Sequence, residues 1–162
     1  MRRIARSPLW LFFLLTLVVT WPLAANSTHS LASDYGDPLF TSWAMGWVSA
    51  QITHALHGHL DAWRAFWDTN IFYPEPNTLA FSDHMVTEAL QVLPIYWISG
   101  NLLLGYNAAL ILSFTLCGFG TYLLVRELTG STVAGLAAGV FFAFNEYRLF
   151  YELSHLQSLT IQ

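Results

Sequence analysis

The chain has 162 residues, of which 55% are hydrophobic and 10% are charged, and its formal net charge is -4. Soluble domains carry about 25% charged residues, so this composition indicates a protein whose solvent is largely lipid. There is no lysine and no cluster of arginines beyond the N-terminus, so we expect no nucleic-acid partner.

The first apolar run covers residues 9–25, carries no charge and follows three arginines, Arg2, Arg3 and Arg6. About 17 apolar residues just suffice to cross the hydrocarbon core. Arginines stay on the cytoplasmic side, so the far end of this segment faces outside. A cleavable signal peptide has the same basic start, but the run is long and Leu23 suits cleavage after Ala25 poorly. We therefore predict an uncleaved membrane helix over residues 8–25.

A long acidic segment follows, and we assign residues 26–104 to one external loop. Seven acids oppose a single base, Arg64, between residues 26 and 88: Asp34, Asp37, Asp61, Asp68, Glu75, Asp83 and Glu88. An acidic loop poor in arginine is typical of the external side.

Asp37-Pro38 predicts the start of a helix in this loop, with aspartate at the N-cap and proline at the first helical position. Helical spacing then places an aromatic-rich set on one face: Phe40, Trp43, Trp47, Ala50 and His54. A short tryptophan-rich helix of this kind favours a position along the membrane surface.

Two prolines and two asparagines predict irregular structure over residues 68–77. Ser82 is a plausible cap for the next apolar stretch, residues 85–104, which polar and helix-breaking residues interrupt: Glu88, Gln91, Pro94, Gly100 and Asn101. Either a spanning helix or a second interfacial helix fits this pattern. We prefer the interfacial one, because buried polar groups are costly in lipid.

Two clearer membrane helices are predicted at residues 106–125 and 132–147, and residues 148–162 look like the start of a further helix without a stop signal. The second carries a small-residue face, Gly135 to Gly139, which lets another helix approach closely. Cys117 lies in an apolar run and is expected to be buried. The expected fold is all-α: a polytopic helical membrane protein, of which this is the N-terminal part, with membrane-parallel amphipathic helices in a long external loop.

No phosphate-binding glycine loop, paired-cysteine metal site or serine nucleophile elbow is present. Asp37 is the leading candidate for chemistry, because a carboxylate just outside the first membrane helix can accept a proton or hold a divalent cation. Its alternative role is to cap the helix that Pro38 begins.

Three other groups of polar residues have both a functional and a structural interpretation. His54, His57 and His59 with Asp61 have a spacing that can bind zinc, although the frayed end of a surface helix accounts for them better. Asp83, His84 and Glu88 sit where acids meet a helix N-terminus. A last set begins after Phe144, near the end of the 132–147 segment: Asn145, Glu146, Arg148, Glu152, His155 and Gln157. Within it, Arg148 either holds a phosphate or anchors a helix end.

Several short motifs, in order, resemble the N-terminal portion of uncharacterised bacterial multi-pass proteins related to C-type (GT-C fold) membrane glycosyltransferases. The resemblance covers about residues 22–162 and rests on these: Gly36-Asp-Pro38, Trp43, Trp47, Asn70-Ile-Phe-Tyr-Pro74, Thr78-Leu-Ala80, Arg126-Glu-Leu-Thr-Gly-Ser131, Tyr147-Arg148 and His155-Leu-Gln157.

The resemblance implies an enzyme of the bacterial inner membrane, multi-pass with a cytoplasmic N-terminus, whose partners are the bilayer and a polyprenyl-phosphate sugar donor. Asp37 matches the acidic catalytic residue and is the candidate ligand for Mg²⁺ or Mn²⁺, although many relatives use no metal. The candidate substrate-binding residues are Asp34, Asn70, Tyr73, His84, Glu88, Arg148, His155 and Gln157.

The chain also departs from the pattern of the better-known members of this family. Their paired acids are adjacent, whereas here Asp34 lies three residues from Asp37, and in the following external loop the second acid is Glu146, Glu152 or a residue farther on. Two other functions stay open: a non-catalytic transporter or flippase, and a membrane assembly subunit. Neither explains the long aromatic external segment.

Overall fold

The computed structural model describes residues 7–160, and every structural statement below concerns this part of the chain. Its elements are all helical, without a strand, which confirms the all-α prediction. They are α1 (Ser7–Val19), η1 (Leu23–Asn26), α2 (Asp37–Leu56), α3 (Asp61–Arg64), η2 (Thr78–Phe81), α4 (Val86–Ser99), α5 (Leu102–Thr129), α6 (Thr132–Ala143), η3 (Tyr147–Tyr151) and α7 (Leu156–Leu159).

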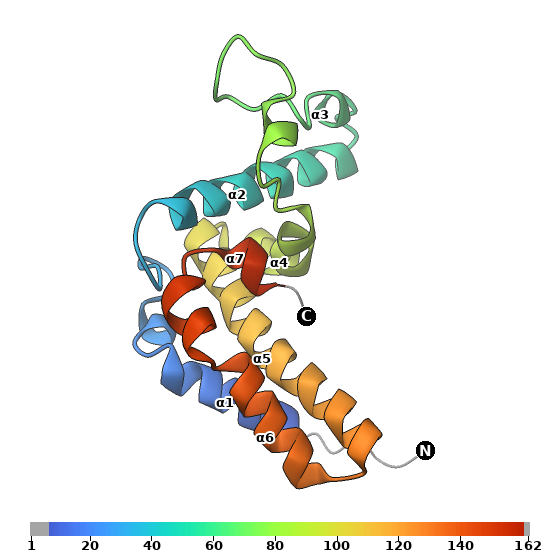
Figure 1. Ribbon diagram of the computed structural model, residues 1–162. Helices are drawn as coiled ribbons and strands as arrows, with labels where there is room; N and C mark the ends of the chain where they lie inside the picture. The colour runs from blue at the N-terminus through green and yellow to red at the C-terminus, as the bar shows by residue number, and fades with distance from the viewer. Residues whose placement is uncertain (1–6, 161–162) are drawn as a thin grey trace.

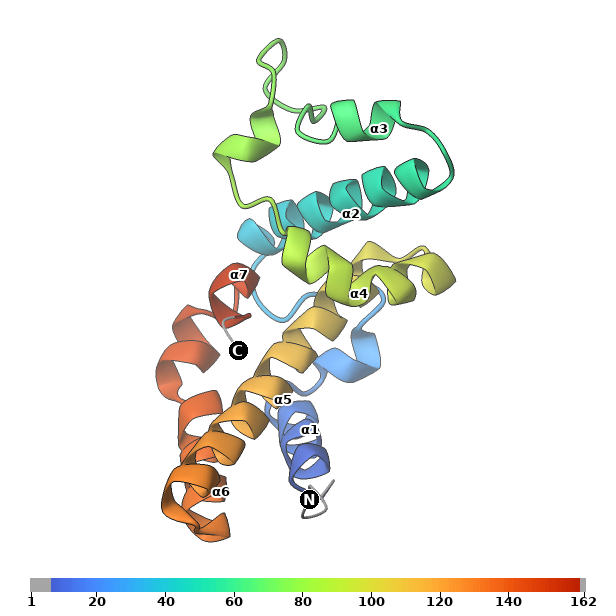
Figure 2. The same cartoon turned by 90° about the vertical axis from the view of Figure 1, so that its right-hand side faces the viewer.

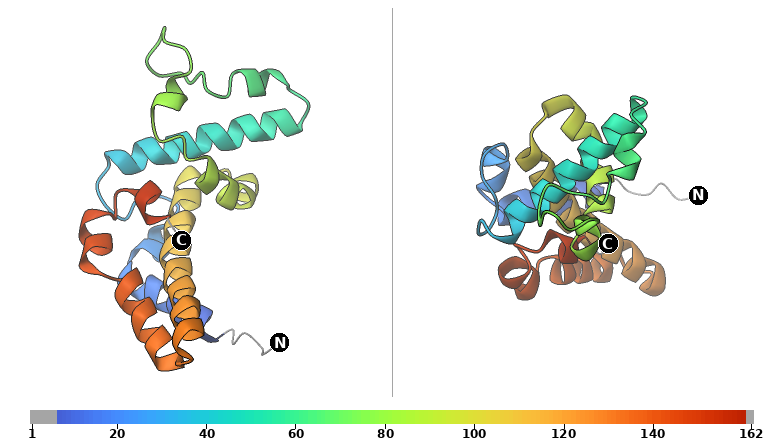
Figure 3. Two further views of the ribbon diagram at one scale, coloured as in Figure 1. Left: turned by 45° about the vertical axis from the view of Figure 1, so that its right-hand side comes forward. Right: turned by 90° about the horizontal axis from the view of Figure 1, so that it is seen from above.

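Helix α5 is the axis of the molecule, and α1, α2, α4, α6 and α7 all pack against it. In Figure 1, α6 returns along the lower half of α5, while α2 lies crosswise at its N-terminal end. Figures 2 and 3 show α4 in the same crosswise layer as α2, with α1 beside the lower half of α5. The helices of the predicted external loop thus form a layer at one end of α5.

Only α5, among the helices of residues 7–160, is long and apolar enough to cross a membrane. Its 28 residues correspond to about 42 Å, against a hydrocarbon core of about 30 Å. Helices α1, α4 and α6 have 13, 14 and 12 residues. Because 44% of the most apolar window of α5 is buried, its apolar side chains serve protein packing as well as any lipid contact. The multi-pass architecture therefore stays a prediction.

The prediction that the first helix runs over residues 8–25 is wrong at its end, because α1 stops at Val19. The cause is Pro22, which has no N–H and disfavours a helical conformation in the residue before it. A 3-10 turn, Leu23–Asn26, follows instead. The arginines expected on the cytoplasmic side, Arg2, Arg3 and Arg6, lie outside the described residues.

Helix α2 begins where Asp37-Pro38 predicts, but not with the predicted cap. Gly36 is the N-cap residue, Asp37 is the first residue of the helix, and no side chain makes a capping hydrogen bond. The carboxylate of Asp37 is instead directed to a partner outside the helix, as described below. The predicted aromatic face exists: the Phe40 and Trp43 rings are 5.7 Å apart and the Trp43 and Trp47 rings 6.3 Å apart.

The segment predicted as one stretch, residues 85–104, is divided between α4 and α5. Gly100 adopts a left-handed conformation with φ of 62°, which ends α4. The Asn101 side chain then accepts a hydrogen bond of 2.9 Å from the Leu104 N–H and caps α5. As a result α5 starts before residue 106, and it continues through Arg126 to Thr129 rather than ending at residue 125.

The predicted cap of α4, Ser82, is also wrong, since Ser82 is extended and α4 begins at Val86. The Val86 N–H donates to Nδ1 of His84 at 3.4 Å, so a different side chain serves this helix end. The 14 residues of α4 correspond to about 21 Å, less than a hydrocarbon core of about 30 Å, and its position along the membrane surface stays a prediction.

The C-terminal segments are shorter than predicted. Helix α6 ends at Ala143, and the residues expected to begin a long helix form a π-helical turn, Tyr147–Tyr151, and the single-turn α7. Asn145 starts the new turn by accepting the Arg148 N–H at 3.0 Å. His155, with φ of -111° and ψ of 75°, interrupts the helical conformation before α7.

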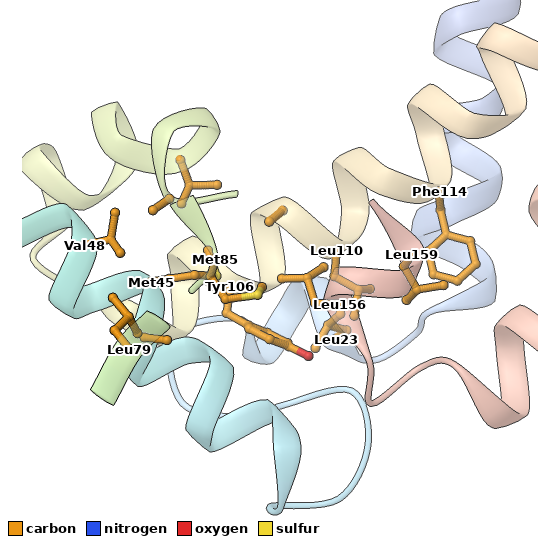
Figure 4. Packing of buried hydrophobic residues seen from close by; sticks show 14 of the residues in the cluster. Leu23, Met45, Val48, Leu79, Met85, Tyr106, Leu110, Phe114, Leu156 and Leu159 are labelled. Carbon is orange, nitrogen blue, oxygen red and sulfur yellow. The ribbon is translucent and has the colours of Figure 1, made fainter. Parts of the chain in front are cut away.

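The hydrophobic core lies where α2, α4, α5 and α7 meet (Figure 4). Its largest fully buried members are Val48, Leu79, Val92, Tyr106, Leu110, Phe114, Leu156 and Leu159. Helix α7 contributes only four residues, yet Leu156 and Leu159 are both fully buried. This short helix is therefore held to the end of α5 by apolar contact.

The small-residue face of α6 packs on α5, which confirms that Gly135 and Gly139 serve packing. A Cβ atom at Gly135 would lie 2.8 Å from the Tyr122 carbonyl oxygen. At Gly139 it would lie 2.6 Å from the Gly118 carbonyl oxygen and 2.5 Å from the ring of Phe12, which α1 inserts between the two helices.

Replacing Gly139 by alanine is therefore expected to destabilise the protein by about 1–3 kcal/mol, because the added methyl group forces α1, α5 and α6 apart. The matched control is Gly120→Ala, since a Cβ atom there meets nothing within 4 Å. That variant is expected to be neutral or stabilising by up to about 1 kcal/mol. Denaturant unfolding of the purified protein in detergent measures both, and equal effects would contradict the packing described here.

Candidate functional site

The candidate site lies at the N-terminal end of α5, where residues from the two ends of the chain meet. Nε2 of His155, directly before α7, is 3.1 Å from Oδ2 of Asp37, the first residue of α2. The two residues proposed from sequence for the catalytic role and for substrate binding are thus direct neighbours.

Two further hydrogen bonds tie the same short segment to acids of the external layer. Nε2 of Gln157 donates to Oδ2 of Asp83 at 3.1 Å. The Thr160 hydroxyl donates to Oε1 of Glu88 at 2.6 Å. Residues 155–160 are here called the docking segment. This segment contacts three acids: Asp37 at the start of α2, Asp83 before α4 and Glu88 in the first turn of α4.

The contacts of the docking segment differ in burial, and hence in energy. The side chains of Asp37 and His155 are 61% and 39% exposed, so their ion pair contributes at most about 1 kcal/mol to stability. Glu88 is 9% exposed, and a buried acceptor that loses its donor costs about 1–3 kcal/mol. Glu88 and Thr160 therefore hold the segment in place, whereas the Asp37–His155 pair stays open to solvent and to a ligand.

The backbone around Asp37 is also fixed. Oδ1 of Asp34 accepts the Gly36 N–H at 2.8 Å, which forms a turn directly before α2. The Thr41 hydroxyl donates to the Asp37 carbonyl at 2.8 Å, one helical turn later. Asp34 thus lies beside Asp37 in space, but one of its oxygens is engaged in shaping this turn.

Tyr106 of α5 lies beneath this region and was missed by the sequence analysis. It is fully buried, and within residues 7–160 its hydroxyl makes no hydrogen bond of normal geometry, although the Thr41 side chain lies close to it. Figure 4 shows that hydroxyl pointing toward Leu23 and Leu156, the latter being the residue after His155. No sequence signal marks Tyr106, because an aromatic residue near the start of an apolar helix is ordinary core composition.

Arg148, proposed from sequence for the phosphate, points into the protein. Its Nη2 donates to the Leu159 carbonyl at 3.1 Å, and its guanidinium lies 5.1 Å from the centre of the Phe114 ring. It supports α7 from the core side, on contacts separate from those of Asp37. The other acids of this region are the exposed Glu146 and the half-buried Glu152.

Three proposed substrate-binding residues lie away from the Asp37–His155 pair. Asn70 and Tyr73 belong to the irregular loop at the top of Figure 1, and Tyr73 is 94% exposed. His84 packs edge-on against Trp67, with ring centres 5.9 Å apart, beside Asp83. The structure thus gathers Asp34, Asp37, Glu88, His155 and Gln157 at the end of α5, and leaves the loop residues outside.

Contacts within the protein account for the histidine cluster at the end of α2. Nδ1 of His57 is 2.7 Å from the Thr53 carbonyl, where the helix ends. The rings of His54 and His59 are 6.2 Å apart, and with Asp61 they line an open surface cavity of about 390 Å³. Across residues 7–160, neither this cluster nor Asp37 belongs to a group of three metal-ligating side chains. Metal use stays a prediction.

No protein-family model, curated protein or solved structure matches this chain. The resemblance to C-type glycosyltransferases accordingly remains an interpretation of the sequence motifs.

Thr160→Val is expected to loosen the docking segment, because valine keeps the shape of threonine and removes the donor to buried Glu88. The expected loss is about 1–3 kcal/mol in the free energy of unfolding. Thr129→Val, at the exposed end of α5, is the control and should change stability by less than about 0.5 kcal/mol. Equal stability of both variants in denaturant titrations would show that the Thr160 contact contributes nothing.

Proposed function

We propose that this chain is the N-terminal part of a membrane glycosyltransferase that takes a sugar from a polyprenyl-phosphate donor at the outer face of the bacterial cytoplasmic membrane. The observation that carries the proposal is the pairing of Asp37 with His155 at the N-terminal end of α5, the described helix that is long enough to cross a bilayer. The motif resemblance supports the same class.

The reaction needs a base at the acceptor and a boundary between lipid and water. An acceptor hydroxyl attacks the anomeric carbon of the donor, and a new carbon–oxygen bond forms. The bond from that carbon to the phosphate oxygen breaks, and the polyprenyl phosphate leaves with the electron pair. Asp37 accepts the proton of the attacking hydroxyl, which its 61% exposed carboxylate is accessible enough to do.

The position of Asp37 suits a substrate with a lipid tail and a polar head. The site lies at the end of the apolar α5, in the layer formed by α2 and α4 (Figure 2). The half-buried ring of Trp43 follows Asp37 on α2, and tryptophan favours the level of the lipid headgroups. Should a divalent cation take part, the carboxylate oxygens of Asp34 and Asp37 are the ligands of the right chemistry.

Asp37→Asn tests this function in the full-length protein. The change keeps the size of the side chain and removes its basicity, so transfer should fall about a hundredfold. Stability should change by less than about 1 kcal/mol, because the Asp37–His155 pair is exposed. The control is Asp61→Asn, an exposed acid whose nearest cation, Arg64, is 3.9 Å away.

The measurement is sugar transfer from radiolabelled polyprenyl-phosphate sugars in membranes that carry equal amounts of each variant. We expect the Asp61→Asn protein to behave as wild type. Near-normal transfer by Asp37→Asn would refute the role of Asp37. Failure of the wild type with every donor, together with movement of a lipid or solute, would favour a transporter or flippase.

A further inference from the structure

We propose that His155 is a positioning residue for Asp37: it holds one carboxylate oxygen and leaves the other to receive the proton of the sugar acceptor. This inference rests on the proposed function and deepens it. In this role His155 orients the carboxylate of Asp37 and does not contact the substrate, whereas the sequence predicts it as a substrate-binding residue.

Protein groups face both ring nitrogens of His155. Nε2 is 3.1 Å from Oδ2 of Asp37. Nδ1 is 3.2 Å from the Tyr151 carbonyl oxygen and 3.2 Å from the Ser154 hydroxyl. A carboxylate accepts hydrogen bonds, so in the tautomer with its proton on Nε2 the ring donates to Asp37, and Nδ1 then accepts from the Ser154 hydroxyl. Neither nitrogen is left for a phosphate.

The carboxylate of Asp37 is engaged on one side. Oδ2 faces His155, and no side-chain capping bond draws the carboxylate back to α2. The side chain is 61% exposed, so Oδ1 remains accessible to a substrate hydroxyl. A directional donor at one oxygen restricts the orientation of the carboxylate, and a positioned base needs such a restraint.

The packing and hydrogen bonds of the docking segment hold His155 itself in place. Leu156 and Leu159 bury the docking segment in the core, and Thr160 fastens its end to Glu88. An exposed ion pair between two long flexible side chains loses much of its energy to ordering. Here the backbone that carries each of the two residues is fixed, so the ring can orient the Asp37 carboxylate with little loss of conformational entropy.

The test compares two substitutions that separate the two ring nitrogens. His155→Gln places an amide donor the same number of bonds from Cα as Nε2, so it can still hold Asp37. His155→Asn places the amide where Nδ1 lies, so it keeps a contact with Tyr151 but not with Asp37. Transfer from radiolabelled polyprenyl-phosphate sugars is measured with the full-length protein in membranes.

We expect His155→Gln to retain kcat within about threefold and His155→Asn to lose about tenfold or more, with KM little changed in both. The change must appear in kcat, because His155 acts on the base and not on the substrate. Equal activity of the two variants, whether both normal or both impaired, would overturn the positioning role. A rise in KM alone would do so too, since it would return His155 to substrate binding.

A second readout does not need transfer activity. Diethyl pyrocarbonate modifies unpaired neutral histidines, so the Asp37 contact should protect His155 in the intact protein. Mass spectrometry is expected to show several-fold faster modification of His155 in Asp37→Ala, which removes the hydrogen-bond acceptor, with His57 unchanged as the internal control. If the wild type transfers no sugar but this protection is seen, the proposed function fails while the pairing stands. An unchanged rate at His155 would contradict the pairing itself.

Discussion

The site depends on one packing constraint: Leu156 and Leu159 are buried against the N-terminal half of α5 (Figure 4). A helix of four residues has almost no stability of its own, since a hydrogen-bonded nucleus costs more entropy than it returns. Its position therefore comes from these two side chains. Once they are buried, the polar residues between and beside them must face outward, which brings His155, Gln157 and Thr160 to three acids of the external layer.

The first turns of α5 fix the other half of the site through two asparagines. Nδ2 of Asn101 donates to the Thr28 carbonyl at 2.9 Å. Nδ2 of Asn107, which is fully buried, donates to the carbonyls of Ser27 at 2.8 Å and Ser30 at 2.7 Å. These bonds hold the linker after α1 against α5, and the linker leads directly into the turn before Asp37. The N-terminal part of α5 therefore positions both chain segments that carry the site, the linker before α2 and the docking segment.

Local patterns in the sequence predicted local features well. Asp37-Pro38 predicted the start of α2, because a helix start depends on neighbours within a turn. The spacing of Gly135 and Gly139 predicted a close helix contact, because small residues four apart share one helix face, but it did not indicate that α5 and Phe12 of α1 would pack there. The cap predictions at Asp37 and Ser82 were wrong, since the carboxylate was taken by a distant histidine and α4 began later. The sequence predicts that Asn101 interrupts an apolar helix, whereas its side chain caps the start of α5.

The residues of the site were named from sequence, but their arrangement was not. Nothing in the periodicity of the chain indicates that His155 reaches Asp37 or that Thr160 reaches Glu88, because such contacts depend on how the helices pack. Packing also decides the role of Arg148: its charge suited either a phosphate or a helix anchor, and its guanidinium lies over the Phe114 ring and donates to the Leu159 carbonyl. Tyr106 was overlooked because its burial, not its type, makes its hydroxyl notable.

The central claim is that the docking segment lies on the acids of the external layer, and cross-linking tests it most directly. The full-length protein, with its own cysteines replaced, would carry cysteines in place of Asp83 and Gln157, whose side chains are in hydrogen-bond contact. A short bis-maleimide should join this pair efficiently in intact membranes. Cysteines in place of Asp61 and Gln157 form the control, because Asp61 lies at α3, beyond α2 (Figure 1). Efficient joining of the first pair alone is the predicted result, and equal joining of both pairs or of neither would contradict the account.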